Sequence, residues 1–244
     1  MTGALYVIGI GPGDPELLTL KGVRIIKETG VLCVPKGREE GRSLALSIVE
    51  KAVSLNGKEI IEGHFPMKKT MNSADVGARR AVPLLDAKWN ETVEAILAQL
   101  EKGKDVAFLT LGDPVIYSTF FYLYDKLLEL CPGLNIEIVP GVSSINASAA
   151  RANISLGLGN EKIAVLPANY LGNLKGTLEV FDTVVLMKVN KVLNEITDLL
   201  SEMGLIENAV CVSRAGMDDE QIFRDIRDID QKKLNYFSMV IVRK

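Results

Sequence analysis

Three glycine-containing loops carry most of the residues in this chain that could contact a polar ligand. Each follows a short apolar run and precedes a helical pattern: GIGPGD at residues 9–14, GDPVIYST at 112–119 and PGVSS at 140–144. Glycine lets the backbone turn sharply and approach a ligand closely. Asp113 adds a carboxylate that could accept from an amine or a hydroxyl. The third loop offers serine hydroxyls and backbone N–H groups to a polar ligand.

Each loop also has a purely structural interpretation when it is considered alone. The first could be a simple glycine turn, Asp113 could cap the next helix, and a serine of the third loop could be an N-cap. The first loop departs from the GxGxxG fingerprint of dinucleotide-binding proteins in three ways. Its third glycine comes one position early, Pro12 lies inside it, and the acidic residue at a suitable distance, Glu28, falls in a helix. A dinucleotide-dependent oxidoreductase is therefore disfavoured.

The remaining composition restricts the chemistry further. The chain of 244 residues has a net charge of −3. It contains three cysteines, none of them in a CxxC pair, and one histidine, His64. The acidic balance argues against a nucleic-acid partner. The cysteine pattern argues against a disulfide framework or a structural zinc site, so we expect no protein-bound metal. No leader-like segment is present and no apolar run approaches ~18 residues, so we expect no membrane partner and a cytoplasmic location.

The elements that must position these loops alternate between strand and helix. Apolar runs predict strands at 4–10, 31–34, 106–111 and 136–139. Capped or amphipathic segments predict helices at 15–29, 43–54, 89–103, 117–130 and 144–151. This alternation argues for a mostly parallel sheet with flanking helices. We place this N-terminal α/β domain at residues 1–153.

The remainder, residues 154–244, reads as a second α/β domain with a mixed sheet. Strand patterns occur at 163–166, 183–188, 209–213 and 238–242, with a helical pattern at 192–203. Residues 221–230 and 236–243 suggest a late hairpin.

The three loops in combination resemble the tetrapyrrole (corrin/porphyrin) methylase family. The family's opening GxGPGDPxLLTxKA-like stretch is matched by residues 9–21, with Gly22 in place of the usual alanine. Its GDPxxYST and PGVSS motifs are matched at 112–119 and 140–144, and later parts fit at 186–188, 212–216 and 236–240. Three features resemble the precorrin-2/cobalt-factor II C20-methyltransferase branch: YSTF at 117–120, FPM at 65–67, and Trp89 opening a helix. Residues 68–88 depart from the family pattern.

The resemblance implies two α/β domains with a cleft between them that holds S-adenosylmethionine. It also implies that a flat corrinoid precursor of cobalamin synthesis binds above the cofactor, and that the protein is a homodimer. The family's cofactor-contacting positions are matched by Pro12, Asp113, Ile116, Ser144, Ile145, Met187 and Val212. Methyl transfer to a ring carbon needs no protein nucleophile, and holding donor and acceptor in line can supply ~7–11 kcal/mol of the barrier. Tyr117 and Asp113 are the candidates for taking the proton that leaves the methylated carbon.

The carboxylates of such a substrate call for basic side chains around it. The substrate-binding candidates are Gly11, Gly13, Lys36, Arg38, Lys188 and Arg214, with Lys68 as a further cation. Each of these cations could instead be a solvated surface charge. The chain could also be another methylase of the family, acting on a different ring carbon, on a porphyrin precursor such as uroporphyrinogen III or on a protein side chain. A non-catalytic nucleotide-binding module is a further possibility. Whether the ring carries cobalt stays open at this point.

Overall fold

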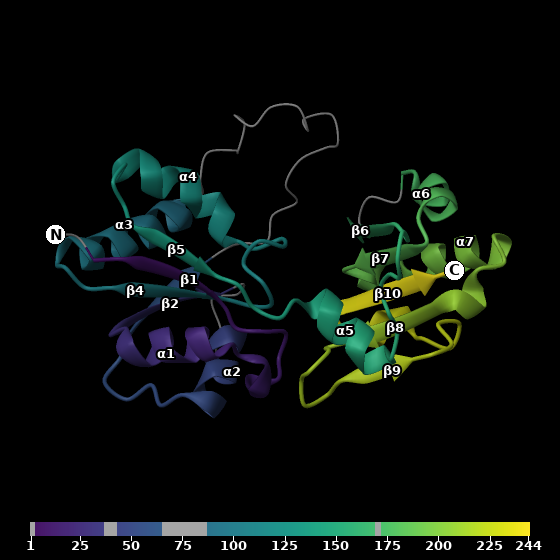
Figure 1. Ribbon diagram of the computed structural model, residues 1–244, viewed down its shortest axis with the longest axis horizontal. Helices are drawn as coiled ribbons and strands as arrows, with labels where there is room; N and C mark the ends of the chain where they lie inside the picture. Colours follow the sequence, from purple (N-terminus) through teal and green to yellow (C-terminus); the bar gives the residue numbers. More distant parts are fainter. Residues whose placement is uncertain (1–2, 37–42, 65–86, 169–171) are drawn as a thin grey trace. The chain divides into compact units, whose positions relative to one another are not determined.

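The chain folds into two compact units, residues 1–142 and 143–244, in a computed structural model (Figure 1). The structure describes residues 3–36, 43–64, 87–168 and 172–244. Arg38, Lys68 and the divergent stretch from 68 to 86 lie outside the described residues, as does the side chain of His64.

The first unit is a three-layer α/β/α sandwich around a parallel sheet, which confirms the predicted sheet type. The strand order is β3-β2-β4-β1-β5, and every described pairing is parallel. The strands are β1 (Leu5–Gly9), β2 (Val31–Lys36), β3 (Glu59–His64), β4 (Val106–Thr110) and β5 (Ile136–Val139). Figure 1 shows α1 (Leu20–Glu28) and α2 (Leu44–Ala52) on one face of the sheet, and α3 (Ala87–Glu101) and α4 (Phe120–Leu130) on the other.

Strand β4 shows why the sheet needs helices on both faces. All five of its residues are buried, and alternate side chains point to opposite faces of the sheet. Ala107 and Leu109 join the core beneath α1 and α2, whereas Val106 and Phe108 join the core beneath α3 and α4. The continuous apolar run in the sequence therefore predicted a central strand correctly.

The helix expected at 15–29 begins later than its sequence suggests. Residues Pro15–Leu17 form a short 3₁₀ helix, in which the Glu16 N–H donates to the Asp14 side chain at 2.9 Å. Helix α1 then starts afresh, because the Thr19 hydroxyl accepts from the Gly22 N–H at 3.1 Å and acts as its N-cap. Two successive caps, at Asp14 and Thr19, thus divide one apolar pattern into two elements.

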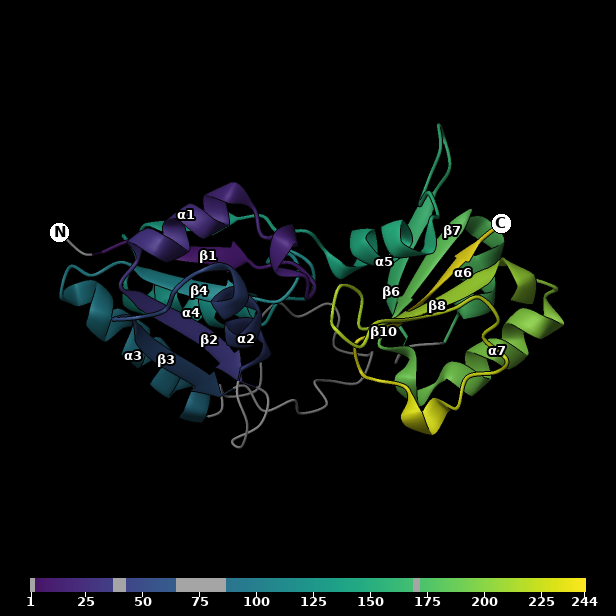
Figure 2. The same ribbon diagram turned by 90° about the horizontal axis from the view of Figure 1, so that it is seen from below.

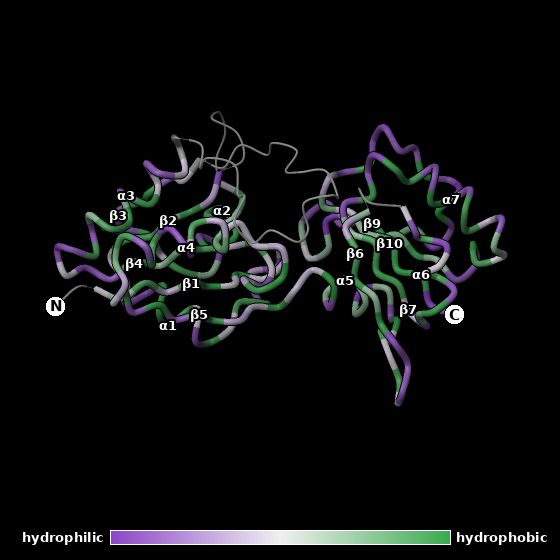
Figure 3. The backbone as a smooth tube through the Cα atoms, turned by 90° about the horizontal axis from the view of Figure 1, so that it is seen from above, coloured by the Kyte–Doolittle hydropathy of each residue, from purple (hydrophilic) through white to green (hydrophobic). Residues whose placement is uncertain are grey.

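The second unit contains a mixed sheet, as predicted, and its strand order is β6-β7-β10-β8-β9 (Figure 2). Strand β6 is parallel to β7, and β10 is antiparallel to both β7 and β8. The strands are β6 (Ile163–Pro167), β7 (Thr183–Met187), β8 (Ala209–Ser213), β9 (Gln221–Phe223) and β10 (Ser238–Arg243). The predicted late hairpin is wrong: β9 pairs with β8, while β10 inserts between β7 and β8. The apolar character of β10, visible in Figure 3, suits this central place.

Helices α6 (Leu174–Val180) and α7 (Leu193–Glu202) cover one face of this sheet and share its core. Helix α5 (Ser144–Ala152) also belongs to the second unit, where it packs against β8. Arg224 holds its end by donating to the Ala152 carbonyl at 3.1 Å. The change of unit therefore falls before α5, at 142/143, whereas the sequence placed the domain boundary after it, at 153/154.

Candidate functional site

The three glycine loops lie at the carboxyl ends of three adjacent strands, β4, β1 and β5. In a parallel sheet these ends share one edge, and ligands of open α/β sheets collect there. The first and second loops pair through their backbones: the Gly112 N–H donates to the Gly11 carbonyl at 2.8 Å, and the Gly11 N–H donates to the Gly112 carbonyl at 3.3 Å. The fold therefore brings together, within the first unit, motifs about 100 residues apart in the sequence.

Glycine is required at this edge because the loops touch each other. A Cβ on Gly9 would lie 2.7 Å from the Gly112 carbonyl oxygen and from the Gly141 nitrogen. A Cβ on Gly141 would lie 2.4 Å from the same Gly112 oxygen. The structural interpretation thus accounts for these two glycines. Gly11 differs, because its φ of 78° is the left-handed conformation that glycine adopts without penalty.

Asp113 joins the second loop to the third. Its Oδ1 accepts from the Val115 N–H and its Oδ2 from the Gly141 N–H, both at 2.9 Å, and the residue is only 9% exposed. The carboxylate thus caps a turn and also links two loops, which is more than the helix cap considered from the sequence. Each carboxylate oxygen has two lone pairs and accepts one N–H here, so each oxygen can accept one further hydrogen bond.

Tyr117 is the exposed member of the second loop. It is 52% exposed and adopts a φ of 53°, the left-handed region that costs a side-chain-bearing residue about 1–2 kcal/mol. Backbone strain of this kind concentrates at functional sites. Ile116 beside it is also exposed, whereas Ser118 turns inward to within 3.1 Å of the Thr110 hydroxyl. The loop therefore exposes Ile116 and Tyr117 to solvent, while Ser118 holds the end of the loop against β4.

In the second unit, four of the predicted residues lie in or just after the carboxyl-terminal ends of β7 and β8, on either side of β10. Met187 ends β7 and Lys188 follows it, while Val212 lies in β8 and Arg214 follows that strand. Lys188 and Arg214 both have positive φ, 61° and 56°. The Lys188 N–H donates to the carbonyl of Ser238, the first residue of β10, at 2.9 Å. The Arg214 N–H donates to the carbonyl of the preceding residue, Phe237, at 2.8 Å. Two cations thus flank the start of the central strand.

The start of α5 supplies the remaining predicted residues of this unit. The Ser143 hydroxyl accepts from the Asn146 N–H at 3.3 Å and is the N-cap, so the serine N-cap interpretation holds for Ser143. Ser144 and Ile145 occupy the first turn, whose N–H groups have no partner within the helix. Such N–H groups favour an anionic ligand.

Lys36 and Arg214 are each paired with a carboxylate of their own unit. The Lys36 Nζ donates to Glu62 Oε2 at 2.9 Å on the neighbouring strand β3, and its side chain is 16% exposed. The Arg214 Nε donates to Asp219, which keeps the pKa of that carboxyl below its usual value. Sequence reasoning missed Asp219, although the acidic run at 218–220, which begins four residues after a predicted cation, was a signal for it.

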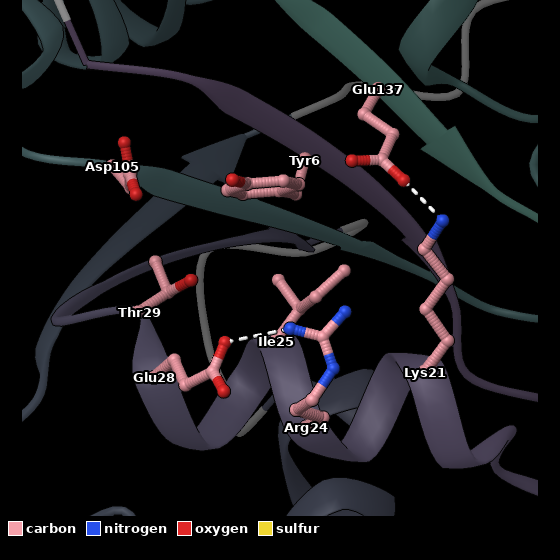
Figure 4. Close-up of a pocket in the computed structure, with 8 residues that line it drawn as sticks. All are labelled: Tyr6, Lys21, Arg24, Ile25, Glu28, Thr29, Asp105 and Glu137. Atoms are coloured by element: carbon pink, nitrogen blue, oxygen red, sulfur yellow. Dashed lines mark hydrogen bonds and ion pairs between the residues drawn. The ribbon is translucent and has the colours of Figure 1, made fainter.

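A polar pocket lies on the first unit at the opposite end of the sheet (Figure 4). Residues from the amino ends of the strands and from α1 line it: Tyr6, Lys21, Arg24, Ile25, Glu28, Thr29, Asp105 and Glu137. Figure 4 shows its cations paired with carboxylates of the same pocket, Lys21 with Glu137 and Arg24 with Glu28. Burial, followed by the nearby Asp105 and Glu137, raises the pKa of the Tyr6 phenol. This pocket contains no residue of the three loops.

The described residues were also compared with the expectations of no protein-bound metal and no membrane partner. Within the described ranges, no group of three or more histidine, cysteine, aspartate or glutamate side chains has metal-binding geometry. No helix in the described part of the chain is both long and apolar enough to cross a lipid bilayer.

Known proteins resemble this chain over its whole length. Residues 4–229 match the model of the tetrapyrrole (corrin/porphyrin) methylases. The cobalt-precorrin-2 C(20)-methyltransferase of Salmonella typhimurium is 38% identical over 100% of this chain and 98% of its own. A probable cobalt-precorrin-2 C(20)-methyltransferase of Methanocaldococcus jannaschii is 34% identical over 98% of this chain and 96% of its own. Among solved structures, a uroporphyrin-III C-methyl transferase of Thermus thermophilus complexed with S-adenyl homocysteine superimposes with a TM-score of 0.66, at 22% identity over 99% of this chain and 98% of that one.

Proposed function

Because the chain belongs to the tetrapyrrole methylase family, we propose that it transfers a methyl group from S-adenosylmethionine to C20 of a corrinoid precursor in cobalamin synthesis, with cobalt-precorrin-2 as the ring. The observation that carries this proposal is the full-length similarity to two relatives named for that reaction, at 38% and 34% identity. The cobalt-containing ring is preferred because both names specify it.

The residues present fit S-adenosylmethionine by their chemistry. In the first unit, the exposed Ile116 offers an apolar contact, and Asp113 has acceptor capacity for a cofactor amine or hydroxyl. Pro12 is buried, and its fixed φ holds the shape of the opening loop. In the second unit, the N–H groups of the first turn of α5, at Ser144 and Ile145, suit the cofactor carboxylate. Met187 is partly exposed and adds an apolar contact, whereas Val212 is only 1% exposed and supports that contact from within β8. The cofactor, when bound, supplies an electrophilic methyl group.

The chain's own contribution is to orient the reactants and to move one proton. As C20 gains its methyl group, the proton on that carbon must leave. Tyr117 is the better placed of the two candidates, because its ring is exposed while both oxygens of Asp113 already accept from backbone N–H groups. We assign Tyr117 to relaying this proton to water and Asp113 to holding the loops in place.

The cations at the two sheet edges would bind the substrate's carboxylates. Lys188 and Arg214 come from the second unit, and Lys36 from the first. Gly11 and Gly13 let the opening loop approach the ring closely. Arg38 keeps its place in the proposal from the sequence alone.

An anaerobic assay tests the proposal directly. The protein is incubated with S-adenosylmethionine and either cobalt-precorrin-2 or metal-free precorrin-2, and the product mass is followed. Gain of one methyl group on the cobalt form, located at C20, is the expected result. Gain on the metal-free ring alone would reverse the preference for cobalt, and no gain on either ring would send the assignment to another member of the family.

Two variants separate the proton relay from general packing. Tyr117→Phe removes only the phenol hydroxyl and should lower kcat by about 10²-fold, the lower range for general acid–base catalysis. Tyr122→Phe is the matched control, because Tyr122 is similarly exposed and contacts Trp89 in a tilted arrangement with ring centroids 5.2 Å apart. Equal kcat values in the two variants would remove Tyr117 from the proposal.

We also propose that the protein is a cytoplasmic homodimer, on the strength of the family resemblance. Size-exclusion chromatography with light scattering tests the assembly, since a mass of one chain, 26.6 kDa, would contradict it. Cell fractionation tests the location.

A further inference from the structure

We infer that Asp219 is a positioning residue: it orients the guanidinium of Arg214 so that the outer edge of that group can bind a carboxylate of the tetrapyrrole. This inference rests on the proposed function, which makes Arg214 a substrate-binding cation. It adds a residue that contacts Arg214 and not the ring itself.

The 214–220 loop is built to bring Asp219 back to Arg214. The Met217 N–H donates to the Arg214 carbonyl at 2.9 Å, and the Glu220 N–H donates to the Met217 carbonyl at 3.1 Å. The Glu220 carboxylate then closes the loop, because it accepts from the Gly216 N–H at 2.7 Å. Backbone turns therefore set the place of Asp219, and little chain entropy remains to be lost when it meets Arg214.

A second arginine supports Glu220 from outside the loop. The Arg151 Nε on α5 donates to Glu220 Oε2 at 2.9 Å, and the Glu220 side chain is only 15% exposed. The loop is thus fixed to a helix at one end and to β8 at the other. A carboxylate carried by such a loop can define the direction of a flexible arginine side chain.

Arg214 is engaged on one side only. Its Nε donates to Asp219, and no hydrogen bond from its Nη1 or Nη2 is found among the described residues. A guanidinium presents its terminal nitrogens as a fork that matches a carboxylate in two parallel hydrogen bonds. The bond at Nε leaves this fork available, and the side chain retains 25% exposure.

Arg227 in the same unit shows the opposite arrangement. Its Nε donates to both oxygens of Asp225, at 2.8 and 3.1 Å, and its Nη2 donates to Asp225 at 2.6 Å. Glu207 also lies 2.8 Å from Nη2. The Nε–Nη2 side of the Arg227 guanidinium is therefore occupied by its own partners, Asp225 and Glu207. The contrast indicates that the single contact at Arg214 serves orientation, and it supplies a matched control.

The test measures steady-state kinetics of four proteins with cobalt-precorrin-2: wild type, Asp219→Ala, Asp219→Asn and the control Asp225→Ala. Asp219→Ala should raise the KM for the ring about tenfold, with kcat and the KM for S-adenosylmethionine within about twofold of wild type. Asp219→Asn keeps an oxygen that can accept from Nε, so it should restore most of the ring KM. Asp225→Ala should behave as wild type.

Three results would overturn the inference. An unchanged ring KM in Asp219→Ala would show that Arg214 needs no orientation. A lower ring KM in both Asp219 variants would show that Asp219 competes with the substrate. A lower kcat together with a higher KM for both the ring and S-adenosylmethionine, and a lower melting temperature, would show a structural role.

Equilibrium binding separates this inference from the proposed function. Binding of the same ring to each protein is titrated by absorbance with S-adenosylhomocysteine present, which requires no turnover. If wild type binds the ring without methylating it, the proposed reaction fails, and the ratio of affinities between wild type and Asp219→Ala still decides the role of Asp219. If wild type does not bind the ring, both proposals are overturned.

Discussion

Replacing Asp113 by asparagine should destabilise the first unit, because one of its two loop contacts must be lost. The asparagine oxygen can accept from only one of the two N–H groups, at Val115 or at Gly141, and its amide nitrogen then faces the other as donor against donor. A hydrogen bond to a charged group contributes about 1.5–3 kcal/mol, and an unsatisfied buried donor costs about 1–3 kcal/mol. Allowing for partial relaxation, we expect a loss of about 3 kcal/mol.

Thermal denaturation measures this loss. For a chain of this size, 1 kcal/mol shifts the melting temperature by about 2–4 °C, so about 3 kcal/mol corresponds to about 6–12 °C. Asp105→Asn is the matched control in the same unit. Asp105 also accepts from a backbone N–H, that of Ala4 at 2.7 Å, but it is exposed and one asparagine oxygen can keep the bond. Its melting temperature should stay within about 2 °C of wild type.

One result would refute the assignment of Asp113 to loop organisation. If Asp113→Asn melts like wild type but loses kcat by about 10²-fold or more, its carboxylate acts on the bound reactants and not on the loops. If it melts lower and regains near-normal kcat at a temperature where it is folded, the loop role stands.

Three further measurements address other parts of the structure. Gly141→Ala should abolish soluble expression or strongly lower the melting temperature, because the added Cβ would meet the Gly112 carbonyl oxygen. Gly133→Ala is the control and should do neither, because a Cβ there meets nothing within 4 Å. Equal behaviour of the two variants would contradict the close approach of the loops. Lys58→Met should cost about 1–2 kcal/mol in urea denaturation, because the Lys58 ammonium donates to two carbonyls at the end of α1, at 2.7 and 3.0 Å. A thiol reagent should label Cys131 alone in the native protein, because burial raises the pKa of the other two thiols, and labelling of all three without denaturant would refute this.

Local patterns in the sequence were enough to predict most of the first unit. The apolar run at 106–111 reads as a strand buried on both faces, and β4 is buried throughout. The three glycine motifs were placed at strand ends, and parallel pairing brings such ends to one edge. These features depend on neighbours within a few residues, so composition and spacing carry them.

Contacts between distant segments were not predictable in the same way. The late hairpin failed because the short apolar runs at 221–223 and 238–243 are compatible with several partners, and only the packed sheet selects β8 for one and a place between β7 and β8 for the other. The boundary at 153/154 rested on glycines that follow α5, but the side of the boundary to which α5 belongs is decided by its packing on β8.

At the candidate site, the sequence by itself determined which residue types are present and the family to which they belong. The tertiary structure decided what each of them contacts. Asp113 has both oxygens engaged by loops 112–115 and 140–141, and Arg214 is engaged by Asp219 at one nitrogen only. These outcomes depend on hydrogen-bond geometry between backbone and side-chain atoms, and a motif specifies residue types without specifying which of those atoms meet.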